Sequence, residues 1–445
     1  MPLCTLPPDL SASIARLAAA LDPRLRHRLA GLLTGLLFAR GRRTVTSWLR
    51  AAGLGNAFRP HYYFLASIGR RTTWIAVQLL LDVAVPTLLG GQPRLLFGLD
   101  DTPTRRYGPQ VQGAGIHHNP TPGPADQAFL YGHVWVTLAW LAPHRLWGTI
   151  ALPLLARLYV RQKDVAKVPR KYHWKFQTKL EQAAELLGWL VKRLGHKGKA
   201  IWLVVDGAYA KKQLLRPARQ LGVVVVSRLR HDAALWSVPS GQRRSGRRGR
   251  RPIYGKQRIS LAKRAGHRQG WTTEDFVLYR QAVAKTYKTF LATWPPAGGT
   301  IRVVVVQQER GWAAFFATDP QASVADILTA VADRGSLEQA FHDLKEVWGL
   351  GQQQVRNVWA SLGAFHLNLW MHTLVELWAW GRSAGELTDR RDSPWDMAAR
   401  RPSHADRRKA LQRASLEQEY QAVGSGSGEV RRIRRLARRL LKMVA

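Results

Sequence analysis

Apolar residues recur every three or four positions through the first 90 residues of the chain. This period is typical of amphipathic helices, so a helical bundle is predicted for the segment. After Arg94 the pattern changes, and Leu95–Leu99 is a short apolar run that ends at Asp100 and Asp101. Such a run predicts a buried strand. The residues of the helical stripe are Ile14, Leu17, Leu21, Leu29, Leu32 and Leu36.

Extended and helical segments then alternate as far as residue 230. Three strands, a helix, a strand, a helix and a final strand predict a mixed α/β sheet with helices on its faces. The strands are expected at Leu95–Leu99, Tyr131–Leu141, Leu146–Val160, Ala200–Val205 and Val223–Val226, and the helices at Phe176–Leu194 and Tyr209–Leu221.

Residues 231–320 differ in character from the segments on either side. A basic low-complexity loop, Arg243–Arg251, leads into a stretch rich in extended runs, with glycines at the turns between them. We therefore expect a β-rich insert that interrupts the α/β core. Its strands are predicted at Phe276–Ala284, Ile301–Gln307 and Trp312–Thr318, and its turns at Gly298-Gly299 and Gly311.

Helical periodicity resumes at Val324 and continues, with a break near Gly349–Gly351, to about Trp380. Beyond Arg390 the chain is polar. This tail contains a Gly-rich stretch predicted to be flexible and a basic amphipathic helix, at Gly424–Gly428 and Arg431–Lys442 respectively.

The charge of the chain indicates a polyanionic partner. Lys and Arg number 68 against 29 Asp and Glu, which gives a formal net charge of +39. Self-repulsion on this scale destabilises a compact chain unless a polyanion neutralises it. Nucleic acid is the expected partner, because each phosphate contact releases a counterion. A solvated basic surface, an acidic protein or a membrane surface would be the alternative.

The distribution of basic residues also suggests which segments of the chain bind DNA. Arg42–Arg50 is a candidate for the basic helix of a helix-turn-helix motif, although a plain bundle with a basic face fits as well. The predicted organisation is an N-terminal helical DNA-binding domain at 1–90, a core at 91–230 that continues at 321–385, the β-rich insert at 231–320, and a basic C-terminal tail at 386–445.

Several classes of protein are excluded. Cys4 is the only cysteine, which rules out a disulfide framework and a Cys-rich zinc site. The longest apolar stretch, Phe129–Ala142, is shorter than the roughly 18 residues of a membrane span. Residues 1–10 lack the features of a signal peptide, so a cytoplasmic, nucleoid-associated protein is expected. The sequence has neither a phosphate-binding loop nor a serine-nucleophile elbow.

Three of the scarce carboxylates have informative positions. Asp101 and Asp206 each end an apolar strand, and Glu338 lies on a predicted amphipathic helix. The carboxyl ends of neighbouring strands meet at one edge of a sheet, where α/β folds place their sites. Asp100 competes with Asp101, because adjacent side chains on a strand point to opposite faces. Taken singly, the aspartates could cap the segments that follow them, and Glu338 could be a solvated helix residue.

Three converging carboxylates would repel one another unless a cation bound them. Oxygen ligands suit Mg²⁺. Two such ions about 4 Å apart can activate the attacking oxygen and stabilise the leaving oxygen of a displacement at phosphorus. With a DNA-binding composition, the carboxylates predict phosphodiester cleavage or strand transfer.

The spacing of charged residues around Glu338 resembles a signature of the DDE transposases of bacterial insertion sequences. In the subgroup with a β-strand insert, this signature is Y-(2)-R-(3)-E-(6)-K. Arg334, Glu338 and Lys345 match its last three positions, whereas the tyrosine position is occupied by Val331.

Both aspartates fit the same resemblance, which covers roughly residues 90 to 380. Asp206-Gly207-Ala208-Tyr209 is similar to the second aspartate segment of the family. The first family aspartate is typically followed by Thr, which favours Asp101 over Asp100.

The resemblance implies an RNase H-like fold and an enzyme that hydrolyses the ends of a mobile element and then directs a 3′-hydroxyl at target DNA. It implies two Mg²⁺ ions, with Mn²⁺ able to replace them, and a homodimer that holds two ends of double-stranded DNA. Asp101, Asp206 and Glu338 would then be the catalytic and metal-binding residues. Arg334 and Lys345 would contact DNA phosphates.

Two rival interpretations stay open at this point. One is a transposase-derived protein that binds DNA without catalysis, and the other is a metal nuclease that never joins strands.

Relatives use an aromatic residue of the insert to stack an extruded base. Trp271, Trp294 and Trp312 are candidates, with core packing as the alternative. Arg243–Arg251 and Arg431–Lys442 are expected to contact phosphates, unless they are solvated arms. His117, His118 and His133 lack a further ligand at zinc-like spacing.

Overall fold

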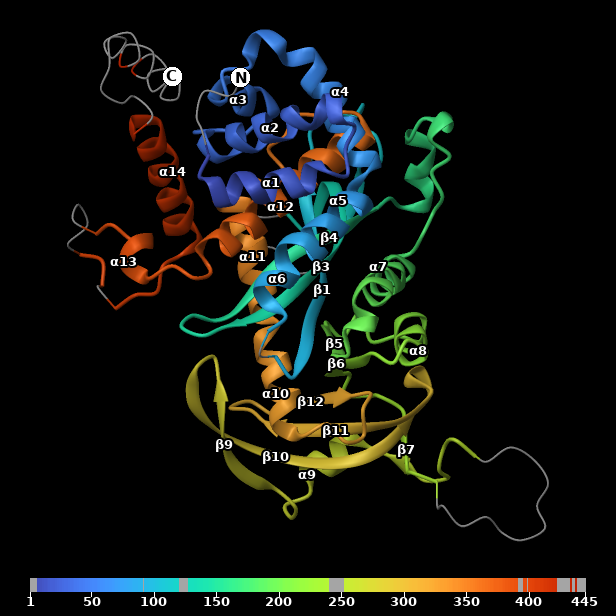
Figure 1. Ribbon diagram of the computed structural model, residues 1–445. Coiled ribbons are helices and arrows are strands. Elements are labelled where there is room, and N and C mark those ends of the chain that lie inside the picture. Colours follow the sequence, from blue (N-terminus) through green and yellow to red (C-terminus); the bar gives the residue numbers. More distant parts are fainter. Residues whose placement is uncertain are drawn as a thin grey trace.

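The chain is arranged in three parts along the molecule, with the N-terminal helices at one end, a mixed sheet in the middle and the strands of the insert at the other end (Figure 1). The computed structural model describes residues 6–90, 92–119, 127–239, 252–390, 395–397 and 399–421, together with 433 and 437. The predicted segments Arg243–Arg251 and Gly424–Gly428 lie outside these residues, as does Arg431–Lys442 apart from Ile433 and Ala437.

Short helices make up the first part of the chain, as the apolar period predicts. Leu17, Leu29 and Leu32 of the predicted stripe are completely buried. The hydroxyl of Thr44 accepts a hydrogen bond from the backbone N–H of Ser47 and so begins α3 directly after the basic loop. The helices are α1 (Pro8–Ala18), α2 (Arg26–Phe38), α3 (Val45–Ala51), α4 (Phe58–Arg70), α5 (Thr72–Gln78) and α6 (Val85–Leu88), with a π-helical turn at Leu79–Ala84.

The core of the sheet has the strand order β4-β3-β1-β5-β6. β1 pairs in parallel with β5, and β5 with β6, whereas β3 runs antiparallel to both β1 and β4. This is the RNase H-like α/β arrangement that the sequence predicted. The strands are β1 (Arg94–Arg105), β2 (Gly115–His118), β3 (Phe129–His144), β4 (Gly148–Tyr159), β5 (Ala200–Val205) and β6 (Val224–Leu229), and the helices between them are α7 (Lys179–Leu194) and α8 (Lys212–Gln220).

The insert extends the core sheet, because its strand β12 pairs with β6 and is followed by β11 and β10. The prediction of one strand over Phe276–Ala284 was wrong. The chain turns there at Tyr279 and Arg280, whose φ angles are 52° and 67°. Positive φ is uncommon outside glycine, so the sequence carries no turn signal at this point. The elements are β7 (Leu235–Trp236), β8 (Arg258–Ile259), α9 (Leu261–Gly266), β9 (Thr272–Leu278), β10 (Gln281–Trp294), β11 (Gly299–Gln307) and β12 (Trp312–Ala317).

A long helix, α12 (Val358–Ala379), is buried on nearly all sides and joins the N-terminal helices to the core. Its contact with α4 is very close. A Cβ atom at Gly69 would lie 1.8 Å from the carbonyl oxygen of Trp359, and one at Gly363 would lie 2.1 Å from that of Leu65. Only glycine permits this approach. No helix in the described part of the chain is long and apolar enough to cross a membrane.

The end of the described chain folds back onto α12, although its polar composition predicts a tail. After α13 (Ala384–Leu387), α14 (His404–Gln421) carries two buried side chains that bind Glu376 of α12. His404 Nδ1 and Arg407 Nη1 each lie 2.5 Å from a different carboxylate oxygen of Glu376. We call Glu376, His404 and Arg407 the α14 latch.

The next residue of α14 extends this connection to the N-terminal helices. The guanidinium of Arg408 donates hydrogen bonds to the carbonyl oxygens of Leu37 and Ala39, at 2.8 and 2.9 Å. These carbonyls lie at the end of α2, where helical partners are lacking. The C-terminal helix therefore fixes α2 and α12 together.

Replacing Glu376 by Gln should lower the free energy of unfolding by about 3 kcal/mol, because Arg407 would remain buried without its counter-ion. Burial alone would raise the pKa of Glu376, but Arg407 and His404 outweigh it and hold the pKa well below its ordinary 4.5. A lowered carboxyl pKa stabilises the fold above the unfolded-state value. The contribution of the latch is therefore present above about pH 4.5 and is lost as the pH falls.

Urea unfolding at pH 7 and at pH 4 measures both effects. Glu417→Gln, on the exposed side of the same helix, is the matched control and should change the free energy by less than about 0.5 kcal/mol. An equally small change for Glu376→Gln at pH 7 would contradict the role of the latch.

Candidate active site

Three charged side chains lie in a row at the carboxyl ends of β1, β5 and β6. The parallel pairing keeps these strands in register, so Asp100, Asp206 and Arg228 each follow the last residue of the parallel pairing, although Asp100 and Arg228 still pair with the antiparallel strands β3 and β12. Side chains in register point to the same face of a sheet. Asp101, one residue further along β1, points to the opposite face.

A helix pair brings a cation and a third carboxylate to the face of Asp100. Arg334 lies at the junction of α10 (Val324–Asp333) and α11 (Gly335–Glu346). Its guanidinium donates to Asp100 Oδ2 and to Glu338 Oε1, both at 2.7 Å. Glu338 is one turn further along α11, whose opposite side is buried through Leu337, Ala340, Phe341 and Leu344. Arg334 therefore links Asp100 to Glu338.

The ionised form of Asp100 is unfavourable in this setting. Burial, aided by the nearby carboxylates of Asp101 and Asp206, raises the pKa of Asp100 to about 6, although Arg334 and the backbone N–H of Asp101 act in the opposite direction. The negative charge of Asp206 thus disfavours ionisation of Asp100, as expected for two carboxyl groups of the same site. A carboxylate pair of this kind is stabilised by additional positive charge.

Asp101 is held by two different elements. Its Oδ2 accepts a hydrogen bond from Lys179 Nζ at 2.7 Å, and its Oδ1 accepts one from the hydroxyl of Tyr209 at 2.8 Å. Lys179 opens α7, and Tyr209 lies in the turn after Asp206. Both carboxylate oxygens of Asp101 therefore have a donor.

The donor set on the Asp100 face suits a hard divalent cation. Asp100, Asp206 and Glu338 supply only oxygen atoms, which Mg²⁺ prefers, and they come from separate elements. The guanidinium of Arg334 between two of these carboxylates shows that the site favours positive charge. Of the predicted triad, Glu338 is thus linked to Asp100 through Arg334, Asp206 lies in register with Asp100, and Asp101 points to the other side of β1.

A broad cleft opens above the strand ends. Asp100, Asp101 and Asp206 line it together with Lys179 and Lys345. The other lining residues include basic, aromatic and histidine side chains: Arg42, Arg105, Tyr107, His117, His118, Phe129 and Arg161. The predicted cation Lys345 therefore faces the same space as the carboxylates.

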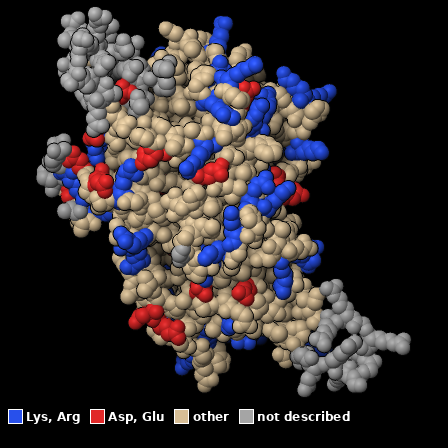
Figure 2. Space-filling model, in the orientation of Figure 1, with Lys and Arg blue, Asp and Glu red and all other residues tan. Residues whose placement is uncertain are grey.

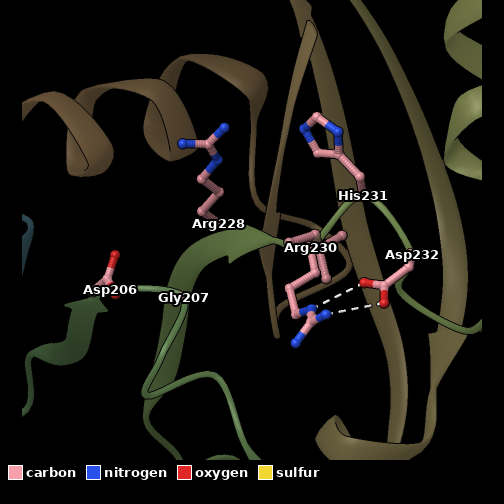
Figure 3. A pocket seen from close by; sticks show the side chains of 7 residues that line it. Asp206, Gly207, Arg228, Arg230, His231 and Asp232 are labelled. Atoms are coloured by element: carbon pink, nitrogen blue, oxygen red, sulfur yellow. Dashed lines mark hydrogen bonds and ion pairs between the residues drawn. The ribbon is translucent and has the colours of Figure 1, made fainter. Parts of the chain in front are cut away.

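A second hollow lies on the insert side of Asp206 (Figure 3). Arg228 of β6 extends beside Asp206, whereas Arg230 is turned toward Asp232 and binds both of its carboxylate oxygens. Arg228 was not among the site residues predicted from the sequence. An arginine in register with a strand-end aspartate, within an otherwise apolar strand, is the signal that would have identified it.

The tryptophans of the insert already have partners. Trp294 is buried against Phe316, His231 stacks on Trp312 with ring centroids 4.2 Å apart, and Lys288 lies over Trp271. The role of any of them in stacking a base stays a prediction.

The histidines of the cleft do not assemble a metal site. His133 is completely buried, and its ring nitrogens lie within hydrogen-bonding distance of the Arg106 guanidinium and the backbone of Gln112. Burial, together with neighbouring cations, lowers the pKa of His117 to about 4 and that of His133 to about 3. His117 is therefore a neutral side chain of the cleft wall, and His133 is a neutral, buried side chain that does not line the cleft.

One group of ligand-type residues lies away from the cleft. His372, Glu376 and His404 place possible ligand atoms within 4.8 Å of one another. The indole N–H of Trp348 donates to His404 Nε2 at 2.7 Å, so the ring carries its proton on Nδ1, toward Glu376. Glu376 also binds Arg407. With its proton and cation in place, this group fits the latch described above and not a metal ion.

Comparison with known proteins gives one match. A family model described as DDE superfamily endonuclease matches residues 16–294, more than half of the chain. The matched span contains Asp100, Asp101 and Asp206, and it ends before α11 with Glu338. No curated protein matches the sequence.

Replacing Asp100 by Asn should stabilise the metal-free protein at pH 8 by about 1–3 kcal/mol and have little effect near pH 4. A raised carboxyl pKa favours folding fully below the unfolded value of 3.8, and this advantage is lost as the pH rises through about 6. The wild type thus carries an unfavourable charge at pH 8 that Asn removes. Denaturant unfolding in EDTA at both pH values measures the difference, and equal effects at the two would contradict the assignment.

Proposed function

Because the chain belongs to the DDE superfamily endonucleases, we propose that it is a DNA transposase that cleaves the ends of an insertion sequence and joins them to target DNA. The observation that carries the proposal is the set of strand-end and helix carboxylates that Arg334 and the register of β1 and β5 bring together. A domesticated DNA-binding protein would have no need of this arrangement.

In the proposed reaction, carboxylates from β1, β5 and α11 hold two Mg²⁺ ions, for which Mn²⁺ can substitute. Asp206 and Glu338 are two of the ligands. For the third, the resemblance favours Asp101, and the register of the sheet favours Asp100. When bound, such ions activate the attacking oxygen and stabilise the leaving oxygen of an in-line displacement at phosphorus.

The cations of the site would position the DNA strand. Arg334 and Lys345 on α11 approach the carboxylates from one side, and Arg228 on β6 lies beside Asp206 on the other. Each can bind a phosphate next to the scissile bond while the carboxylates hold the metal. Arg334 would give up its carboxylate partners to bind a DNA phosphate.

The molecular surface supports a long DNA contact. Lys and Arg side chains extend along the face shown in Figure 2 from the N-terminal helices toward the insert, and acidic groups occur there in small clusters. Double-stranded DNA carrying the terminal repeats and the target is the proposed substrate. In the proposed complex, a homodimer holds two ends at once.

Replacing Glu338 by Gln should reduce Mg²⁺-dependent cleavage of DNA that carries the flanking ends of the gene by on the order of 10²-fold or more. The change removes one ligand charge and preserves side-chain volume, so DNA affinity should be retained. Asp206→Asn should behave in the same way. A gel assay of cleavage, with binding measured in Ca²⁺, separates the two effects.

The outcomes distinguish the rival functions. Equal cleavage by Glu338→Gln and wild type would contradict the assignment of this glutamate. Binding without cleavage by the wild type would favour the catalytically inactive DNA-binding protein, and hydrolysis without strand joining would favour a nuclease.

Replacing Arg228 by Ala should weaken DNA binding uniformly across sequences and reduce the slope of log K against log salt by about 1, because one phosphate contact is lost. Arg230→Ala is the matched control, since Arg230 already binds Asp232. Fluorescence anisotropy at several salt concentrations measures both. If the control lost as much affinity as Arg228→Ala, the effect would be one of overall charge and not of the site.

A further inference from the structure

Adjacent aspartates on β1 have entirely different surroundings. Asp100 faces Arg334, and through it Glu338, on the side of α11. Asp101 faces Lys179 and Tyr209 on the side of α7. Neighbouring side chains on a strand point to opposite faces, so the two carboxylates have different partners although both line the same cleft.

We propose that the two aspartates divide the work: Asp100 faces the metal, and Asp101 is a positioning residue that fixes Asp206. This inference rests on the proposed function and assigns Asp101 a role other than the metal ligand that the sequence favours. Lys179, Asp101 and Tyr209 form what we call the aspartate brace.

The brace acts on the turn that carries Asp206. The backbone N–H of Tyr209 donates to the carbonyl oxygen of Asp206 at 2.9 Å, and that of Ala208 donates to the Asp206 carboxylate at 3.1 Å. Tyr209 itself is only 3% exposed, and its hydroxyl reaches Asp101. The hydrogen bond from Tyr209 therefore ties the tight turn after β5 to the neighbouring strand β1.

Lys179 is the second residue of the brace that contacts the Asp101 carboxylate. It is the first residue of α7, whose start is fixed by reciprocal hydrogen bonds between Thr178 and Glu181. Its ammonium group balances the charge of Asp101 at 2.7 Å and so limits the negative charge close to Asp100. A metal ion on Asp101 would have to displace this ammonium group, whereas on Asp100 it would displace Arg334, to which the proposed reaction gives a DNA phosphate as a new partner.

The division of roles predicts different effects of substitutions on metal binding. Mn²⁺ binding to the full-length protein without DNA, followed by electron paramagnetic resonance, should weaken by well over 10-fold in Asp100→Asn. Tyr209→Phe should weaken it by about 10-fold, as expected when a group that orients a ligand is lost. Asp101→Asn should resemble Tyr209→Phe more closely than Asp100→Asn.

Hydrogen exchange provides a readout that is independent of metal and activity. Amides of residues 206–209 should exchange faster in Tyr209→Phe and in Asp101→Asn, and at the wild-type rate in Asp100→Asn. Tyr131→Phe is the matched control, because it removes a tyrosine hydrogen bond to the carbonyl oxygen of Gly108, outside the brace. It should change neither metal binding nor exchange at 206–209. Lys179→Met offers a second test of the brace if Asp101→Asn does not fold.

The proposal would be overturned if Asp101→Asn abolished Mn²⁺ binding while Asp100→Asn retained it. Unchanged metal binding and exchange in Tyr209→Phe would overturn the brace. Failure of the proposed function has another signature: a wild type that binds Mn²⁺ with the expected dependence on Asp100 and Tyr209 but does not cleave DNA. A wild type that binds no Mn²⁺ would overturn both.

Discussion

Burial of the Asp100 carboxyl group beside other carboxylates is the constraint on which the site depends. Asp100 and Asp206 lie in register, and the raised pKa of Asp100 reflects mainly its burial, with a smaller contribution from the charges of Asp101 and Asp206. Arg334 provides the compensating charge within the protein itself, and it does so from the junction of two helices that also carry Glu338. Arg334 thus partly compensates the charge of two carboxylates in the protein without metal.

The rest of the fold keeps α11 and the sheet in place. α12 follows α11 and is clamped between the N-terminal helices, through Gly69 and Gly363, and the C-terminal helix, through the α14 latch. Arg408 adds direct hydrogen bonds from α14 to the end of α2. The helix that carries Glu338 thus belongs to a packed unit formed from both ends of the chain, which explains why a polar C-terminal segment is buried.

Much of the fold follows from the sequence because periodicity and strand-end residues are local signals. The strand that ends before Asp206 and the amphipathic helix around Glu338 were both predicted correctly. The turn at Tyr279-Arg280 was not, since neither residue favours positive φ. The choice between Asp100 and Asp101 also depends on more than local sequence: alternation separates the two side chains, but only the pairing of β1 with β5 and the position of α11 show which face holds Asp206 and Glu338. Lys179 and Arg228 were missed for the same reason: Lys179 reaches Asp101 from α7, and Arg228 comes to lie in the same hollow as Asp206 through the pairing of β5 with β6.

The position of a bound metal ion tests this account most directly. Crystals of the protein grown with Mn²⁺ and measured at the manganese absorption edge would locate the ion by its anomalous scattering. The account predicts a peak in contact with oxygen atoms of Asp100 and Asp206, with Arg334 moved off Asp100 and the Lys179–Asp101–Tyr209 contacts intact. A peak on Asp101 with Lys179 displaced, or a peak at none of these carboxylates, would contradict it.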